Sequence, residues 1–379
     1  MARTSLSGFE VGTLIGEPGD SAATGSGMSV DTSVFRSGLS SVKATAVSGV
    51  NGTWVGLNNL STYNRLYMKV TSFPSTTARI LTGSGSSVNL KLNPNGSIAY
   101  YNGASLIGTS AAVLIDTMWH RVEWRKGTAT AVPVLLIDGI TEVTGSPSGW
   151  TYTSNIGPND TVADTYTVNF DDYASDNADW PGPGRVVLLR PISDNNVGGW
   201  KRGGGSTTTN LWIPVSISPP PGVASANETD NTNIESATNS ASDDCDLNCA
   251  SYLSMGININ DIVKGMIAVV RNGEDAGTNT KAGAISIVSN PVQVGEDAFT
   301  FGFDLGAHGL EAGFWNTSAG TVQTPTSVVV GTSPVLRVGK RTATTRVVCV
   351  DFMGIYVDYT PMGEKSVQLN QAVNRAAVW

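Results

Sequence analysis

The sequence predicts an all-β chain built mainly from two sandwich domains, and three observations point to this fold class. Charged residues make up only 14% of the 379 residues, glycine occurs 43 times, and hydrophobic residues still reach 40%. Such a composition is typical of many short strands joined by tight turns. Apolar and polar residues alternate over short runs, and no helical 3.6-residue period extends over ten residues before residue 190.

Residues 1–192 are expected to form the first sandwich, because strand-like runs are separated there by turn residues at short, regular spacing. The clearest unit is a hairpin over residues 88–102, in which alternating apolar residues precede the turn "NPNG" and a returning "SIAYY". Asn95-Gly96 suits the positive φ angles of a tight reversal. The other runs expected as strands are "GFEVGTLIG", "SSVKATAV", "RLYMKVTSF", "ARILTG", "WHRVEWRKG", "VPVLLIDG", "TYTVNFDDYASDN" and "GRVVLLRP".

The stretch "DTMWHRVEWRKG" (116–127) places a histidine among tryptophans and acids, which raises the question of an active site. In a strand, His120 and Glu123 point to opposite faces, and Asp116 lies about 13 Å from His120 along the chain. We therefore expect a core strand with His120 near its edge and no acid within hydrogen-bonding reach of the imidazole. The residues expected to share the face of His120 are Met118, Val122 and Trp124.

An acidic segment, "NFDDYASDNADW", follows the strand pattern near residue 170. Carboxylate-rich loops can hold calcium, and aromatic rings can stack on a sugar. The candidate ligand-binding residues are Asp171, Asp172, Tyr173 and Trp180. The alternative interpretation is a solvated loop whose Asp and Asn residues form turns.

Residues 193–250 have the composition of a linker, with a glycine triplet, three consecutive prolines and a long polar run. The inserted segment "NLWIPVSI" is too apolar to remain in solvent, so it is expected to pack on a domain or on a neighbouring subunit. Its candidate interface residues are Leu211, Trp212 and Ile213.

A second strand-rich block, residues 251–361, predicts the second sandwich and ends in the long run "TTRVVCVDFMGIYVDYTP". In the tail, residues 362–379, apolar residues recur at helical spacing and Trp379 is the last residue. This tail is expected to be an arm that docks on another subunit or frays, and Trp379 is a further interface candidate.

Charge and hydropathy restrict the partners that the chain is expected to have. The net charge of -8 repels nucleic acid, and no run of Lys and Arg offsets it locally. No run of about 18 apolar residues exists to span a membrane, and the N-terminus lacks an apolar stretch of signal-peptide length. We expect a soluble protein that does not bind nucleic acid, insert into a membrane or follow the usual export route.

The residues needed for a metal centre or for catalysis are scarce. Three cysteines form no disulfide framework, and Cys245 and Cys249, at C-x3-C spacing, are expected to be inert thiols. His308 lies in a glycine-flanked turn, and the chain has no G-x-S-x-G nucleophile motif. The E-x-D-x-x-E pattern of sandwich glycosidases is also absent. We expect no catalytic residue, no metal centre and no cofactor, with calcium at the acidic segment as the one alternative.

In order along residues 3–192, "SGFEVGT", "RSGLSSVKA", "RLYMKV", "DTMWHRVEWRKG", "LLIDG", "VNFDDYASDN" and "WPGPGRVVLLRP" form a series. This series resembles the laminin-G-like, concanavalin A-like jelly rolls of virion proteins of tailed bacteriophages. The second block resembles the sandwich that often follows in such proteins, through "WNT" and the closing "DFMGIYVDYTP".

The resemblance implies a structural component of the virion, in the tail, tail fibre or baseplate or as a decoration of the head surface. It also implies a homo-oligomer that contacts other virion proteins and assembles in the host cytoplasm. A glycan-binding adhesin that attaches to the host surface is the alternative function, and a polysaccharide hydrolase is the third.

Overall fold

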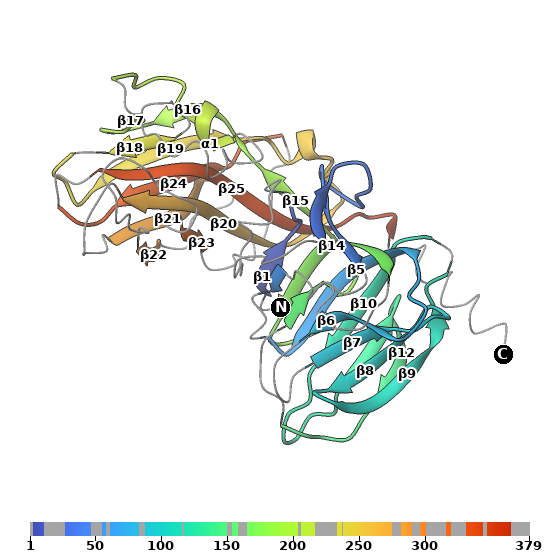
Figure 1. Cartoon of the computed structure of the whole chain (residues 1–379). Helices are drawn as coiled ribbons and strands as arrows, with labels where there is room; N and C mark the ends of the chain where they lie inside the picture. Colours follow the sequence, from blue (N-terminus) through green and yellow to red (C-terminus); the bar gives the residue numbers. More distant parts are fainter. Residues whose placement is uncertain are drawn as a thin grey trace. The chain divides into compact units, whose positions relative to one another are not determined.

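The computed structural model describes most of the chain and divides it into two compact units (Figure 1). Unit 1 holds the described residues from 3 to 186 and from 360 to 364, and unit 2 holds those from 187 to 359. The described residues are 3–10, 27–46, 55–57, 61–82, 88–115, 117–149, 154–157, 165–203, 206–216, 233–236, 238–274, 282–289, 296–300, 316–319, 331–343 and 347–364.

Unit 1 consists of two antiparallel sheets, here called sheet A and sheet B. Sheet A has the order β12-β11-β10-β5-β14-β3-β2, with β1 also paired to β14, and sheet B has the order β4-β13-β6-β7-β8-β9. The strands of sheet A are β1 (Arg3–Ser7), β2 (Met28–Asp31), β3 (Ser41–Ala46), β5 (Tyr63–Ser72), β10 (His120–Arg125), β11 (Val134–Ile137), β12 (Ile140–Thr144) and β14 (Tyr166–Asp176). Those of sheet B are β4 (Val55–Leu57), β6 (Ala78–Thr82), β7 (Val88–Leu92), β8 (Ser97–Asn102), β9 (Ser105–Val113) and β13 (Ser154–Ile156).

The core of unit 1 lies between these two sheets, as the period-two pattern predicts. Leu90 and Leu92 of β7 and Val122 and Trp124 of β10 are fully buried. Tyr100 of β8 crosses the core, and its hydroxyl donates a hydrogen bond of 2.9 Å to the carbonyl of Arg125 in sheet A. Burying an aromatic ring contributes its apolar area, while the bonded hydroxyl avoids the cost of an unpaired polar group.

Unit 2 is a second sandwich, made of sheet C and sheet D. Sheet C has the order β17-β18-β25-β20-β23, with β15 also paired to β25, and sheet D has the order β16-β19-β24-β21-β22. The strands of sheet C are β15 (Arg185–Leu189), β17 (Lys201–Arg202), β18 (Ile234–Ser236), β20 (Ile262–Glu274), β23 (Asn316–Ala319) and β25 (Val348–Thr360). Those of sheet D are β16 (Pro191–Asn196), β19 (Asp243–Cys249), β21 (Ala282–Ser289), β22 (Asp297–Thr300) and β24 (Val335–Lys340).

The segment predicted to be a linker, residues 193–250, is largely part of unit 2 where the structure describes it. It supplies most of β16, all of β17, β18 and β19, and the short helix α1 (Trp212–Ser216). Trp200 is fully buried, and its indole nitrogen donates to the carbonyl of Asp243 over 3.1 Å. The linker prediction is therefore wrong for these residues. Their few large apolar side chains are far apart in sequence, but the fold collects them in one core.

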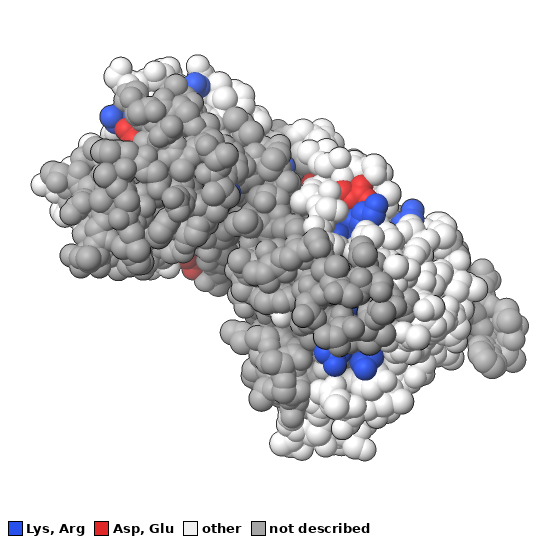
Figure 2. Space-filling view, viewed as in Figure 1, with Lys and Arg blue, Asp and Glu red and all other residues white. Residues whose placement is uncertain are grey.

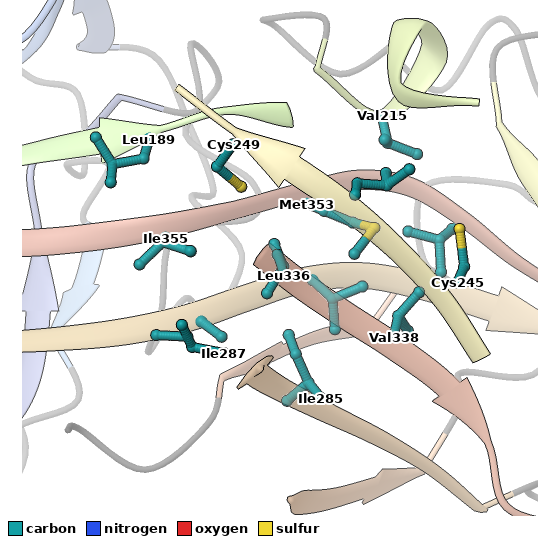
Figure 3. Close-up of a cluster of buried hydrophobic side chains, with 14 of the residues drawn as sticks. Leu189, Val215, Cys245, Cys249, Ile285, Ile287, Leu336, Val338, Met353 and Ile355 are labelled. Carbon is teal, nitrogen blue, oxygen red and sulfur yellow. The ribbon is translucent and has the colours of Figure 1, made fainter. Parts of the chain in front are cut away.

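The two cysteines of the C-x3-C pair lie on one face of β19, inside the core of unit 2 (Figure 3). Leu336, Val338 and Met353 belong to the same cluster of buried side chains (Figure 3). Burial is the main cause that raises the pKa of both the Cys245 and the Cys249 thiol. A thiol that stays protonated and buried is a poor nucleophile, which agrees with the expectation of inert thiols.

The prediction of an all-β fold with two sandwiches is confirmed. The predicted domain boundary after residue 192 moves to residues 186 and 187, inside β15. Of the predicted C-terminal arm, residues 362–364 belong to unit 1, whereas Trp379 lies outside the described residues. In the part of the chain that the structure describes, no helix has the length and apolar character needed to cross a membrane.

A buried acid–base pair lies on the face of sheet C that points away from this core. Asp351 of β25 is 1% exposed, and its carboxylate lies 3.4 Å from the guanidinium of Arg271 on β20. Burial raises the pKa of Asp351 to about 7, although the positive charge of Arg271 acts in the opposite direction. The desolvation of the carboxylate therefore outweighs its attraction to the arginine.

We predict that Asp351 makes stability depend on pH. Because its folded pKa lies above its unfolded value of about 3.9, its contribution is fully present below about pH 4 and is lost as the pH rises through about 7. Chemical denaturation of Asp351→Asn and of the wild type at pH 4 and pH 8 tests this. The free energy of unfolding of the variant minus that of the wild type should be larger at pH 8 than at pH 4, by about 1 kcal/mol or more. The control is Asp297→Asn on β22, and a constant difference between Asp351→Asn and the wild type at all pH values would contradict the prediction.

Candidate functional site

The face of sheet A that points away from the core of unit 1 carries charged and aromatic side chains on three adjacent strands. In register, Arg121, Tyr67 and Asp171 form one row across β10, β5 and β14, and Glu123 and Arg65 belong to the next row. We call this surface the outer face of sheet A. All five side chains are buried, because loops of unit 1 lie over them.

Two predicted ligand residues, Asp171 and Asp172, lie at a β-bulge in β14 rather than in a solvated loop. The register between β14 and β5 shifts between Asp171 and Ala174, and Asp172 has a φ of 54°. Such a bulge inserts an extra residue and redirects its side chain. Both carboxyl groups are 0% exposed. The prediction of an open, oxygen-rich loop is wrong for these two residues.

The bulge carboxyl groups bind donors from the loop of residues 33–40. The guanidinium of Arg36 donates to Asp172 over 2.5 Å and to the carbonyl of Gly184 over 2.8 Å. The backbone N–H of Arg36 donates to Asp171 over 2.7 Å, and that of Val186 donates to Asp172 over 2.5 Å. The hydroxyl of Ser37 also donates to Asp172. These hydrogen bonds therefore connect the loop of residues 33–40, the bulge in β14 and the start of β15.

Arg36 also connects this point to the C-terminal part of unit 1. Its guanidinium stacks 3.4 Å from the centre of the Tyr67 ring and forms an ion pair with Glu364. Glu364 in turn lies 3.6 Å from Arg185. An arginine can bond carboxylates along its edges while its flat face contacts an aromatic ring. We call Arg36, Tyr67, Asp172 and Glu364 the arginine clamp.

Burial strongly changes the protonation of the groups around the clamp. Burial, together with the nearby carboxyl groups of Asp172 and Glu10, raises the pKa of Asp171 well above its usual range. Burial also raises the pKa of Tyr67, which the charges of Arg36, Arg121 and Arg65 partly offset. Burial and the neighbouring carboxyl groups thus favour the protonated form of Asp171.

The carboxyl oxygens at the bulge are occupied by protein donors, which argues against the calcium alternative at Asp171 and Asp172. A calcium ion needs six to eight oxygen ligands, and here a guanidinium already neutralises the carboxylate of Asp172. Among the residues that the structure describes, no group of three or more His, Cys, Asp or Glu side chains could hold a metal ion.

The other two predicted ligand residues lie in different environments. Tyr173 is fully buried, and its hydroxyl donates to the side chain of Asn64 over 3.2 Å. Trp180 is half-buried and packs edge-on against Tyr63, with ring centres 5.2 Å apart and planes at 68°. The structure therefore separates Trp180 from the bulge residues, and only Trp180 remains a candidate for contact with a ligand.

Sequence reasoning missed two residues beside Trp180. The register of sheet A aligns Arg125 and Tyr63 on adjacent strands, and the Arg125 guanidinium lies 5.9 Å from the Tyr63 ring. A turn fixes Trp180: Asp176 accepts from the N–H of Asp179 over 3.2 Å, and Asp179 accepts from the N–H of Trp180 over 2.7 Å. Tyr63 is 117 residues before Trp180, so no local pattern could have indicated the pair. We call Tyr63, Trp180 and Arg125 the aromatic site.

The expectation that no acid reaches the imidazole of His120 is wrong. Nδ1 of His120 lies 2.8 Å from a carboxylate oxygen of Asp138, in the turn between β11 and β12. Asp138 and Gly139 have φ values of 52° and 85°, and the other oxygen of Asp138 accepts from the N–H of Arg121 over 2.9 Å. The carboxylate therefore fastens this turn to β10 and orients the imidazole. His308 lies outside the described residues.

The side of β10 opposite His120 is buried as well. Arg121 and Glu123 form an ion pair of 2.9 Å, and both side chains are buried. The backbone N–H of Gly182 donates to Glu123 over 2.7 Å, and the carbonyl of Gly182 accepts from Arg65 over 3.2 Å. The segment near Gly182 thus covers this strand, so β10 is buried on both faces.

The predicted interface residues in the segment "NLWIPVSI" contact their own unit to different extents. Leu211 is fully buried in the core of unit 2, and Trp212 packs against that core while partly buried. Ile213 is 37% exposed. The expectation that the segment packs on a domain is met within unit 2, and Ile213 keeps a substantial exposed surface.

The sequence matches no protein-family model and no curated protein. Among solved structures, the chain is similar to the cellulose-induced protein Cip1, with 17% identity, a TM-score of 0.34, and 44% of this chain and 90% of that chain covered. It is also similar to domain 4 of the arabinanase AbnA from Geobacillus stearothermophilus, with 13% identity, a TM-score of 0.33, and 46% and 94% covered. A tandem CBM22 domain of Xyn10C from Paenibacillus barcinonensis is 14% identical, with a TM-score of 0.26 and 93% and 97% covered. Similarity at this level carries no ligand or activity over to this chain.

We predict that the arginine clamp is needed for the stability of unit 1. Arg36→Leu should lower the free energy of unfolding by about 3 kcal/mol or more, because it leaves the buried carboxylate of Asp172 without its cation. Denaturant unfolding of unit 1, followed by tryptophan fluorescence, measures this change. The matched control is Lys43→Leu: Lys43 is 39% exposed and lies 4.0 Å from Asp31, so its loss should cost less than about 1 kcal/mol. If the two variants lost equal free energies of unfolding, the prediction would be contradicted.

Proposed function

We propose that this chain is a structural component of a tailed bacteriophage particle that acts by assembly with other virion proteins and with copies of itself. The observation that best supports a structural role is the arginine clamp. On the outer face of sheet A, the polar side chains that could have contacted a substrate bind instead to loops of the same unit. Such a closed face suits a rigid building element.

The pairing of His120 with Asp138 and the arrangement of Asp171 and Asp172 both support a non-catalytic role. His120 and Asp138 fasten a turn to a strand, and the carboxyl groups of Asp171 and Asp172 are neighbours in sequence on one buried bulge. A glycosidase needs two carboxyl groups that face each other across a substrate, about 5 to 10 Å apart. Two adjacent carboxyl groups that bind Arg36 and backbone N–H groups do not match that arrangement.

The phage role rests on the resemblance of the strand series in unit 1 and is tested on intact particles. We expect mass spectrometry of purified virions to detect the chain at a fixed copy number, and cryo-electron microscopy to place it in a symmetric assembly. Light scattering of the purified protein should give a homo-oligomer. Absence from the particles, or a monomer at all concentrations, would contradict the proposal.

The aromatic site favours host-surface glycan binding as a second function. Tyr63 and Trp180 are half-buried, their rings pack edge-on, and the Arg125 guanidinium lies 5.9 Å from the Tyr63 ring. Aromatic rings that are held in place bind the apolar faces of sugars, and a neighbouring guanidinium can bond sugar hydroxyls. The Asp176–Asp179 turn fixes Trp180 in advance, which lowers the entropy lost on binding.

We predict that Trp180→Ala and Tyr63→Ala each weaken binding to the best neutral glycan on an array by about tenfold, which corresponds to about 1.4 kcal/mol. Binding should persist in EDTA, because the carboxylates at the bulge bind protein donors rather than calcium. The control is Phe35→Ala, which removes another partly exposed ring of unit 1. If the three variants behave alike, or if no neutral glycan binds, the second function is wrong.

A further inference from the structure

Arg125, the cation of the aromatic site, has no acidic partner among the described residues. Two other arginines near the outer face of sheet A are paired, Arg36 with Asp172 and Arg121 with Glu123. Charged residues make up only 14% of the chain, and in the view of Figure 2 most of the described surface of unit 1 is neither basic nor acidic. A single guanidinium without a counter-charge can therefore decide which ligands this site prefers.

The β10–β11 hairpin holds the guanidinium of Arg125 in place through one of its nitrogens. Nε of Arg125 donates to the carbonyl of Val132 over 3.0 Å. The turn of the hairpin is itself closed, because the N–H of Thr128 donates to the carbonyl of Ala131 and the Thr128 hydroxyl accepts from the N–H of Ala131, each over 2.9 Å. A fixed guanidinium loses little conformational entropy when it binds a ligand.

The two terminal nitrogens of Arg125, Nη1 and Nη2, remain as donors. In the described part of the chain no protein group accepts a hydrogen bond from them, and neither belongs to the buried polar atoms that lack a partner. The residue is half-buried, as are Tyr63 and Trp180. The aromatic site thus offers two parallel N–H donors beside two aromatic rings.

The acids in the turn that holds Trp180 do not neutralise Arg125. Asp176 is 0% exposed and accepts from the N–H groups of Ala178 and Asp179 over 2.7 and 3.2 Å. Asp179 accepts from the N–H of Trp180 over 2.7 Å. In register, Asp176 of β14 faces Tyr63 of β5, and Tyr63 faces Arg125 of β10. The strand of Tyr63 therefore lies between Asp176 and the guanidinium.

We infer that the aromatic site selects glycans that carry a carboxylate on the sugar in contact with its rings, and that Arg125 is the residue that determines this specificity. The inference rests on the second proposed function, because it names the class of glycan that the site takes. The rings supply affinity for the sugar whether or not it is charged, whereas the guanidinium supplies the preference for the acid.

The geometry of a guanidinium matches a carboxylate better than other groups of a sugar. Two terminal nitrogens can donate parallel hydrogen bonds to the two oxygens of a planar carboxylate, and such charge-assisted bonds are about twice as strong as those to a hydroxyl. One guanidinium balances one negative charge, whereas a phosphate monoester carries about two. In a uronic acid the carboxyl group is attached directly to the sugar ring. A ring that contacts Tyr63 therefore brings its carboxylate near a guanidinium 5.9 Å from the centre of the tyrosine ring.

The test compares carboxylated glycans with their own methyl esters, which keep the sugar and lose the charge. Glycans that end in glucuronate, galacturonate or sialic acid, and the methyl ester of each, serve as probes on an array and in biolayer interferometry. We expect the full-length wild type to bind at least one acid at least tenfold more tightly than its ester. Arg125→Gln should bind the acid as weakly as the ester and change the affinity for the ester by less than about threefold. Trp180→Ala should weaken both by the same factor.

Lys91→Gln is the charge-matched control, because it removes one cation that lies 4.4 Å from the centre of another tyrosine ring of unit 1, that of Tyr101. This variant should keep the preference for the acid, and thermal melting shows that each variant is folded. Equal binding of acid and ester to the wild type, or equal losses of preference in Arg125→Gln and Lys91→Gln, would overturn the inference. If Trp180→Ala still abolishes binding in that case, glycan binding itself stands. If no glycan of either kind binds, the second proposed function fails and this inference fails with it.

Discussion

The burial of one charged pair, Arg36 with Asp172, holds together segments of unit 1 that are far apart in sequence. Asp172 is fully buried, and a carboxylate without water must be compensated by a cation and by hydrogen bonds. Both kinds of compensation come from segments far apart in sequence: the loop near Arg36, the backbone of Val186 and, through Arg36, Glu364. The bulge, the loop that covers it and the C-terminal segment of unit 1 must therefore take up mutually compatible positions.

Unit 2 also contains a buried acid beside an arginine, but there desolvation of the carboxyl group outweighs the attraction of the arginine. Asp351 and Arg271 are buried together, but their distance of 3.4 Å and the strong desolvation leave the carboxyl with a raised pKa. In the arginine clamp, Arg36, Ser37 and the backbone N–H of Val186 all donate to Asp172, whereas at Asp351 the loss of water dominates. An arginine beside a buried acid therefore does not by itself keep the pKa of that acid low.

The outer face of sheet A differs along its strands, and the two functional proposals rest on different parts of it. Arg121, Tyr67, Asp171, Glu123 and Arg65 are buried beneath loops of unit 1, whereas Tyr63 and Trp180 are half-buried. A closed face supports a structural role, and an aromatic pair suits a neutral sugar. One domain can thus combine assembly with a surface contact.

The sequence by itself determined the all-β class, the hairpin around Asn95-Gly96 and the unreactive cysteines, because alternation, turn chemistry and apolar context are local properties of the chain. Only the tertiary structure decided that residues 193–250 supply strands, that Asp138 reaches His120 and that Asp171 and Asp172 are buried beside Arg36. In each of these cases the partner residue is distant in sequence or lies across a turn, and the sequence does not reveal the register of that turn. From composition alone, residues 193–250 were expected to form a polar linker and the acidic segment a solvated loop. Composition gives the number of charges, but it does not show which charges lie close together or which side chains are buried.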